Sequence, residues 1–184
     1  MTLDDLRAAV DPEWQAHLAD NPRRHFVRAG RTLGHRDLPE APGWTASQAG
    51  RAVALSLLTP EQVTEVYQQG DAGEKLAVLK ALPLLDLGDE AVQVLHDALR
   101  TNDTRLVGAA LGPYAGHLDE ATWRQGVIKC VFMGVPLAVV DRLDERADAE
   151  LAAMLTAFAD ERAAAGRAMP DDAVALLNRM KEYR

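Results

Sequence analysis

The stretch that decides the fold class is 102–167, which reads NDTRLVGAALGPYAGHLDEATWRQGVIKCVFMGVPLAVVDRLDERADAELAAMLTAFADERAAAGR. Its apolar residues follow the period of an α-helix, and no segment alternates with the period of two that a half-buried strand needs. Asp103, Asp119 and Asp148 each stand at the start of such a segment, where an aspartate caps free backbone N–H groups. The stretch therefore predicts successive helices over 103–116, 119–134 and 148–166.

Helix signals of the same kind extend over the rest of the chain. Thr59-Pro60-Glu61-Gln62 combines a cap, a proline at the first helical position and a glutamine that bonds back to the cap. Ala and Leu supply 57 of the 184 residues, whereas Ile occurs once, which favours helix over sheet. We therefore predict an all-α fold, an irregular helical-repeat (HEAT-like) array or bundle of about ten helices. The other expected helices span 2–10, 11–19, 22–35, 45–58, 60–69, 72–86 and 89–101, with a short one after 170.

The domain organisation follows from length and from one long connection. A chain of 184 residues predicts a single helical domain, 1–184. The segment 33–44, LGHRDLPEAPGW, separates an N-terminal helical arm (1–36) from a main helical body (45–184). Asp-Glu-Ala opens expected helices at both 89 and 119, which favours stacked helix pairs. An irregular bundle predicts the same helices, so both architectures stay open.

Composition excludes several classes of function. The net charge of −8 and the pI of about 5.1 argue against sequence-independent nucleic-acid binding, which needs many Lys and Arg contacts to phosphates. The single cysteine, Cys130, excludes an intrachain disulfide and a multi-cysteine metal site. No Gly-rich phosphate loop, zinc motif or nucleophile motif occurs, so we expect no metal and no cofactor. Without a leader or an apolar run of about 18 residues, we expect a soluble cytoplasmic protein with no transmembrane segment.

A family resemblance is carried by the same C-terminal part of the chain. The runs NDTRLVGAALGPYA, LDEATWRQGVIKCVFMGVPL, LDERADAELAAML and FADERAAAGR resemble the EboA family, and GWTASQAGRAVALSLL (43–58) and the helix around Arg31 are similar to it as well. The resemblance implies an all-helical bacterial protein of a small metabolic gene cluster, linked to making or exporting a secondary metabolite. The family has no agreed activity, so the resemblance brings no catalytic residues with it.

Glu161 is the first candidate site residue, because it falls on the expected apolar stripe of its helix. A carboxylate that faces a core needs a cationic or hydrogen-bonding partner. We therefore predict that Glu161 is buried and paired, either as a structural ion pair or as a ligand-binding or acid–base group. The stripe consists of Leu151, Met154, Phe158 and Ala165, and the expected partners are Arg142, Arg146, Arg167 and Lys129.

Four other residues could likewise have either a structural role or a role in ligand binding. Lys129 is flanked by apolar residues, so it either extends to the helix edge or lines a cavity. Tyr114 follows Gly-Pro, where its hydroxyl could face a groove. Arg142 and Arg146 lie one helical turn apart and form either a solvated surface network or a clamp for phosphate or carboxylate.

Trp123 and Cys130 lie seven residues apart on one expected helix face, with Val127 between them. This spacing is typical of core packing, and we predict that both side chains are buried. A reactive Cys130 would instead need a nearby histidine, such as His117, or a nearby positive charge.

A basic stripe is expected on the helix 22–35. Arg24, Arg28, Arg31 and His35 follow one another at steps of four, three and four, so they share a face. We predict that these four side chains face solvent while Phe26 and Leu33 pack inward. The stripe is either a solvated face that pairs with acidic neighbours or a contact for an anion or an acidic lipid.

These features leave three functions to compare. The first is a non-catalytic helical scaffold or binding protein, whose partner is a protein or a small-molecule metabolite. The second is an enzyme or enzyme subunit acting on a phosphorylated or carboxylated metabolite, and the third is a membrane-surface adaptor. We expect the first, and leave a peripheral membrane contact and a homo-oligomer open. The enzyme alternative would use Lys129, Arg142 and Arg146 beside Glu161 and Tyr114, and the adaptor the basic stripe.

Overall fold

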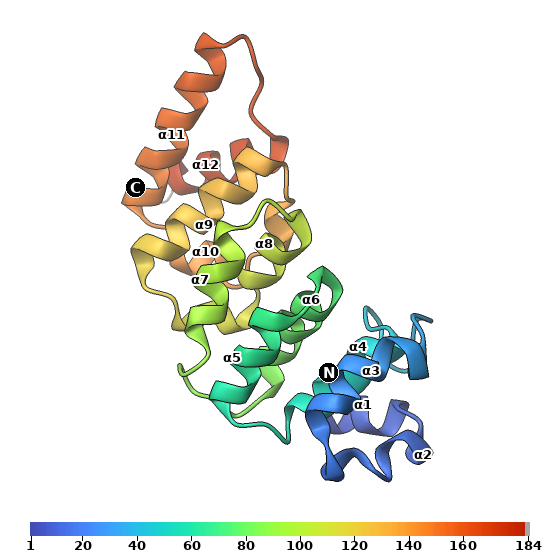
Figure 1. Ribbon diagram of the computed structural model, residues 1–184. Coiled ribbons are helices and arrows are strands. Elements are labelled where there is room, and N and C mark those ends of the chain that lie inside the picture. Colours follow the sequence, from blue (N-terminus) through green and yellow to red (C-terminus); the bar gives the residue numbers. More distant parts are fainter. Residues whose placement is uncertain (183–184) are drawn as a thin grey trace. The chain divides into compact units, whose positions relative to one another are not determined.

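The computed structural model describes residues 1–182 and confirms the all-α fold (Figure 1). Within these residues no strand forms, and the pairing of Asp37 with Thr45 is an isolated antiparallel bridge. The helices are α1 (Leu3–Ala9), α2 (Pro12–Gln15), α3 (Pro22–Leu33), α4 (Ala46–Leu55), α5 (Pro60–Gln69), α6 (Ala72–Ala81), α7 (Val92–Arg100), α8 (Thr104–Ala110), α9 (Glu120–Met133), α10 (Leu143–Arg146), α11 (Ala149–Ala164) and α12 (Asp171–Glu182), with 3-10 turns η1 (Leu18–Asp20), η2 (Leu82–Leu84), η3 (Pro113–His117) and η4 (Leu137–Val139).

Local capping explains where the helices begin. Thr45, Thr59 and Asp71 each form a complete capping box, in which the cap side chain and the third helical residue bond each other's backbone N–H groups. Prolines shorten two expected helices: the helix expected over 72–86 ends at Ala81 and continues as the 3-10 turn that contains Pro83. The helix expected over 103–116 likewise divides into α8 and the 3-10 turn that begins at Pro113.

The chain divides into two compact units, Met1–Asp97 and Ala98–Arg184. Helix α7 contributes residues to both. The expected single domain and the HEAT-like repeat stay predictions.

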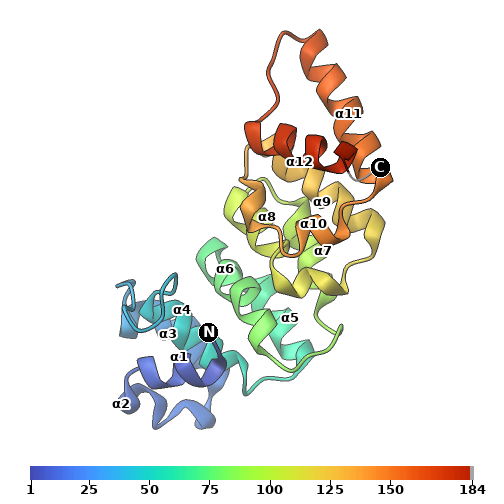
Figure 2. The ribbon, with the colours of Figure 1, turned by 180° about the vertical axis from the view of Figure 1, so that it is seen from behind.

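Helix α4 is the buried centre of the first unit. It packs against α1, α3 and α6, and Figures 1 and 2 both show α3 alongside it. Nine of its ten residues are buried, because Ala and Gly positions let neighbouring helices come close. At Gly50 an added Cβ would lie 2.3 Å from the Leu33 side chain. Any larger residue there would therefore displace the Leu33 side chain, which packs from α3 onto Gly50.

The second unit is built around α9. Helix α8 and the N-terminal part of α11 pack on it, and α12 packs on α11 (Figure 2). Trp123 and Cys130 are both fully buried, which confirms the core packing predicted from their spacing. Leu151 and Leu155 of α11 are also fully buried, and they define the face of α11 that meets the core.

Burial also makes Cys130 unreactive. Desolvation raises the pKa of its thiol to about 12, so at pH 8 only about one molecule in ten thousand carries the nucleophilic thiolate. We expect native protein to resist a thiol-disulfide reagent that labels the denatured protein within seconds. Absorbance of the released thiolate measures this, and rapid labelling of the native protein would show that the site opens frequently.

Candidate functional site

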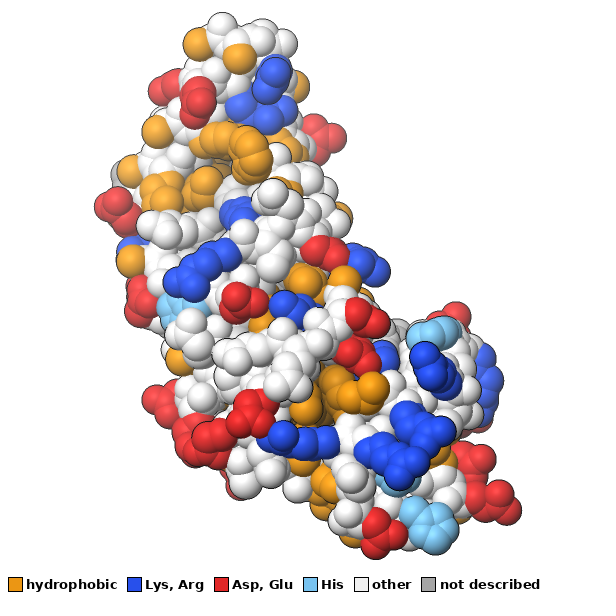
Figure 3. Space-filling view, in the orientation of Figure 1, with side chains coloured by type: hydrophobic (Ala, Val, Ile, Leu, Met, Phe, Trp, Pro, Cys, Tyr) orange, Lys and Arg blue, Asp and Glu red, His pale blue; other side chains and the backbone are white. Residues whose placement is uncertain are grey.

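The basic stripe on α3 has the orientation that its spacing predicts. Arg24, Arg28, Arg31 and His35 are exposed, Phe26 is fully buried, and Leu33 is half-buried. On the face shown in Figure 3, Lys and Arg side chains gather over α3. The prediction of a solvent-facing stripe is therefore confirmed for the three arginines. His35 is exposed but does not continue the helical stripe, because α3 ends at Leu33 and Gly34 turns the chain with a φ of 71°.

Part of this stripe forms one wall of a groove within the first unit. The groove encloses a volume of about 750 Å³, and its other wall is the N-terminal turn of α6. Arg28, Arg31 and His35 come from the α3 segment, and Arg51 comes from α4. The groove thus gathers cationic groups from two helices beside a helix N-terminus, whose backbone N–H groups favour negative charge.

Arg51 is a charged residue fixed at the base of this groove. Its side chain is 7% exposed, Nε donates to the Phe26 carbonyl at 3.2 Å, and Nη2 donates to Glu74 at 3.3 Å. A Cβ at Gly30 would lie 3.5 Å from both Arg51 Nη2 and His35 Cε1. The guanidinium and the imidazole therefore both lie beside Gly30, at the distance of ordinary van der Waals contact from an added Cβ.

The charges of the groove are not fully balanced. Glu74 neutralises Arg51 and also completes the capping box of α6, while Asp71 accepts from the Glu74 N–H. Among the side chains that the structure describes, no carboxylate forms an ion pair with Arg28 or Arg31. His35 contacts the buried Ser47 hydroxyl at 3.0 Å through Nδ1. Two unpaired guanidinium groups are thus available to an anion.

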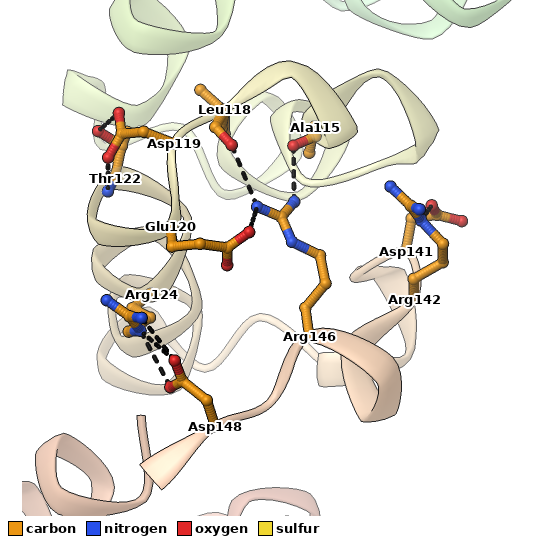
Figure 4. A network of polar contacts seen from close by, with 10 residues as sticks. All are labelled: Ala115, Leu118, Asp119, Glu120, Thr122, Arg124, Asp141, Arg142, Arg146 and Asp148. Carbon is orange, nitrogen blue, oxygen red and sulfur yellow. Dashed lines mark hydrogen bonds and ion pairs between the residues drawn. The ribbon is translucent and has the colours of Figure 1, made fainter. Parts of the chain in front are cut away.

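In the second unit, Arg146 has a structural role rather than a ligand-binding one (Figure 4). It is 11% exposed, and it donates to the carbonyls of Ala115 and Leu118 at 2.7 and 3.1 Å and to Glu120 at 2.9 Å. Its guanidinium also lies 4.6 Å from the centre of the Trp123 ring. These acceptors occupy the fork that a phosphate clamp would need, so Arg146 instead joins α10 to the turn before α9.

The Arg124–Asp148 pair, also drawn in Figure 4, joins α9 to the start of α11. Arg124 Nε lies 3.0 and 3.1 Å from the two carboxylate oxygens, and Asp148 caps α11 by accepting from the Leu151 N–H. These hydrogen bonds, above all those from Arg124, lower the pKa of Asp148.

Asp148 thus has two roles that can be tested separately: its side chain caps α11, and its charge pairs with Arg124. We expect Asp148→Ala to lower the free energy of unfolding by about 1–2 kcal/mol, because the cap is lost, and Asp148→Asn to cost less, because an amide still caps and the partly exposed ion pair contributes little. Since the folded pKa is depressed, the contribution of the charge is present above pH about 4 and is lost as the pH falls further. Urea titrations of the three proteins at pH 7 and pH 3 measure this, and an Asn variant whose deficit persists at low pH would contradict it.

The other candidates of the second unit lie in two places, the η3 turn and the C-terminal end of α7. Tyr114 is buried, with its ring centre 4.7 Å from that of His117. Lys129 is half-buried and donates to the Leu99 carbonyl at 2.7 Å, where a cation complements the C-terminal end of α7. Arg142 is half-exposed, pairs with Asp141 at 3.4 Å and has a φ of 48°. Arg142 Nη2 also lies beside Gly116, so Arg142 and Arg146 both reach the η3 turn that carries Tyr114, whereas Lys129 lies at the end of α7.

The prediction that Glu161 is buried and paired is wrong. Its side chain is exposed, as is that of Arg167, and none of the side chains that the structure describes forms an ion pair with it. The physical reason is that only the N-terminal part of α11 packs against the core. Leu151 and Leu155 are buried, whereas no residue over 156–165 is, so Glu161 stands on a part of the helix that has no core beneath it.

Two further observations concern membrane spans and metal sites. None of the helices over 1–182 combines the length and the apolarity that crossing a membrane requires. Among the same residues, no three His, Cys, Asp or Glu side chains lie close enough together to hold a metal ion.

The sequence prediction missed Arg51 and Glu74, which fix the base of the groove. Arg51 did carry a signal, because it is a lone charge inside the apolar run SQAGRAVALSLL. A charge in such a run needs a buried partner. Glu74 carried no such signal, because a glutamate at the third position of a helix is already explained by its role in a capping box.

Comparison with known proteins gives one match. The model of the family described as metabolite traffic protein EboA matches residues 32–178, which is well over half of the chain. Arg24, Arg28 and Arg31 precede this range, whereas His35, Arg51 and Glu74 lie inside it. No curated protein and no solved structure matches the chain. The extent of the match confirms the resemblance found in the sequence, and the chain belongs to the EboA family.

Proposed function

We propose that the chain is a non-catalytic helical binding protein of metabolite traffic, and that its ligand is a small anionic metabolite held in the groove between α3 and α6. The observation that carries this proposal is the pair of unpaired guanidinium groups, Arg28 and Arg31, which line a groove of about 750 Å³. The description of the family as a metabolite traffic protein supports a metabolite as the ligand. The volume suits a small molecule.

The arrangement of the groove supports binding rather than turnover. Arg51 is held by the Phe26 carbonyl and neutralised by Glu74, so it fixes the base of the groove and is not a mobile proton donor. The alternative of an enzyme acting on a phosphorylated or carboxylated metabolite would rest on Lys129, Arg142 and Arg146 beside Glu161 and Tyr114. Lys129 and Arg146 are engaged in structural contacts, and Glu161 is exposed on α11.

Isothermal titration calorimetry with inorganic phosphate, pyrophosphate and citrate tests the proposal. We expect at least one of these anions to bind, and Arg28→Gln/Arg31→Gln to weaken that binding about tenfold or more, because two charge-assisted contacts are lost. Arg105→Gln/Arg179→Gln is the matched control, since it removes the same charge from exposed residues of the second unit. Binding of none of the three anions, or equal loss in both double variants, would overturn the proposal.

A membrane-surface role is the second candidate, because Val27 is 59% exposed beside Arg28 and lines the same groove. An apolar side chain among arginines is a pattern that also suits anionic lipid. Sedimentation with phosphatidylserine vesicles and with phosphatidylcholine vesicles distinguishes the two. Salt-sensitive binding to phosphatidylserine vesicles alone, without binding of the free anions, would favour the membrane.

A further inference from the structure

A second groove adjoins the first at Arg28, whose side chain lines both. This second groove has a volume of about 340 Å³ and is bordered by the rings of Trp14, His17 and His25. The cationic stripe of α3 therefore has a groove rich in arginine along one part and a groove rich in aromatic rings along another. A ligand that contacts Arg28 can extend into both.

The Trp14 ring is held in a fixed orientation beside this space. Its Nε1 donates to the Thr32 hydroxyl at 3.0 Å, and its ring meets that of His25 edge to face, with centroids 5.4 Å apart and an interplanar angle of 81°. Trp44 and Trp123 are buried, whereas Trp14 is half-buried. Trp14 is thus the tryptophan whose ring surface remains open to a ligand, and it needs no rearrangement to make that contact.

We infer that the ligand is a planar ring that carries a phosphate or similar oxyanion, with the ring against Trp14 and the anion at Arg28 and Arg31. This inference rests on the proposed function, because it adds a ring subsite to the same anion site. The charges orient such a ligand in one direction. Each groove is lined by two carboxylates, Glu13 and Asp20 in the aromatic groove and Asp71 and Glu74 in the first. The first groove sets three arginines against them (Arg28, Arg31 and Arg51) and the aromatic groove two (Arg24 and Arg28), so the balance of charge favours the anionic end in the first groove.

The test compares phenyl phosphate with cyclohexyl phosphate, which has the same charge and a similar size but no planar ring. Inorganic phosphate gives the affinity of the anion site alone. By calorimetry we expect phenyl phosphate to bind about fivefold or more tightly than cyclohexyl phosphate, because only a flat ring can stack on the indole. Equal affinities of the two esters would overturn this inference while leaving the proposed function intact. If neither ester binds, this inference fails, while the proposed function is decided separately by the binding of inorganic phosphate, pyrophosphate and citrate.

Substitutions of Trp14 test whether the ring of the ligand binds against this side chain. Trp14→Leu should make the two esters bind equally, whereas Trp14→Phe should preserve the preference for phenyl phosphate. Binding of cyclohexyl phosphate to each variant shows that the anion site is still folded. If Trp14→Leu does not fold, the tryptophan fluorescence of the wild type and of Trp14→Phe decides the matter. Phenyl phosphate should change the emission of the wild type only, and a persistent preference in Trp14→Leu or an unchanged wild-type emission would place the ring elsewhere.

Discussion

Replacing Arg146 with alanine is expected to lower the free energy of unfolding by about 3–4 kcal/mol, since hydrogen bonds from a charged donor contribute roughly 1.5–3 kcal/mol each when they are shielded from water. The side chain is 11% exposed and bonds two main-chain carbonyls, those of Ala115 and Leu118. The substitution leaves both carbonyls without this donor and uncovers one face of the buried Trp123 ring.

Urea denaturation followed by circular dichroism measures this loss, and Arg146→Lys provides a graded comparison. A lysine keeps the charge but lacks the planar fork that reaches two carbonyls at once, so it should recover less than half of the stability. The exposed Arg105, which pairs with Asp103 within its own helix cap, serves as a control, and Arg105→Ala should leave the transition midpoint unchanged. An Arg146→Ala protein as stable as this control would mean that Arg146 is an ordinary surface residue.

The second large effect is expected at Arg51. We predict that Arg51→Met lowers the free energy of unfolding by about 3–5 kcal/mol, because it leaves a largely buried carboxylate without its partner. The Glu74 side chain is 13% exposed, and the Phe26 carbonyl loses the Arg51 donor as well. Methionine keeps most of the aliphatic volume, so the loss reports the charge and the hydrogen bonds rather than a cavity.

A double-mutant cycle separates the ion pair from its surroundings. Glu74→Gln alone removes the charge of the carboxylate but keeps an oxygen that can accept in the capping box. The double variant Arg51→Met/Glu74→Gln should be more stable than the sum of the two single losses predicts, because no unpaired charge remains. Thermal and urea unfolding of the four proteins measure the coupling. Strictly additive losses would show that Arg51 and Glu74 do not interact in solution.

Features encoded by local spacing could be predicted from the sequence. The capping box at Thr59 and the cap at Asp148 each depend on residues within four positions, so they identify helix starts without knowledge of the fold. The exposure of Arg28 and Arg31 opposite Phe26 also follows from helical period alone. Such patterns are sufficient for the fold class and for one wall of the groove.

Features that depend on packing between distant segments could not be predicted from the sequence. The groove exists because α4 brings Arg51 and α6 brings Glu74 against α3, and no local pattern relates these positions. Glu161 shows the opposite failure: its apolar neighbours Met154 and Phe158 suggested a buried face, but α11 packs through Leu151 and Leu155 instead. A carboxylate at the edge of a stripe is ambiguous until the partner helix is known.

An anion that binds between α3 and α6 can be located directly from the amide chemical shifts of the isotope-labelled protein. On titration with inorganic pyrophosphate, we predict that the largest saturable shifts fall on Ala72 and Gly73, the free amides at the start of α6, and on Arg28 and Arg31 of α3. Residues of the second unit should not move. Saturable shifts confined to the second unit, or no saturable shift at any amide, would contradict the binding of an anion between α3 and α6.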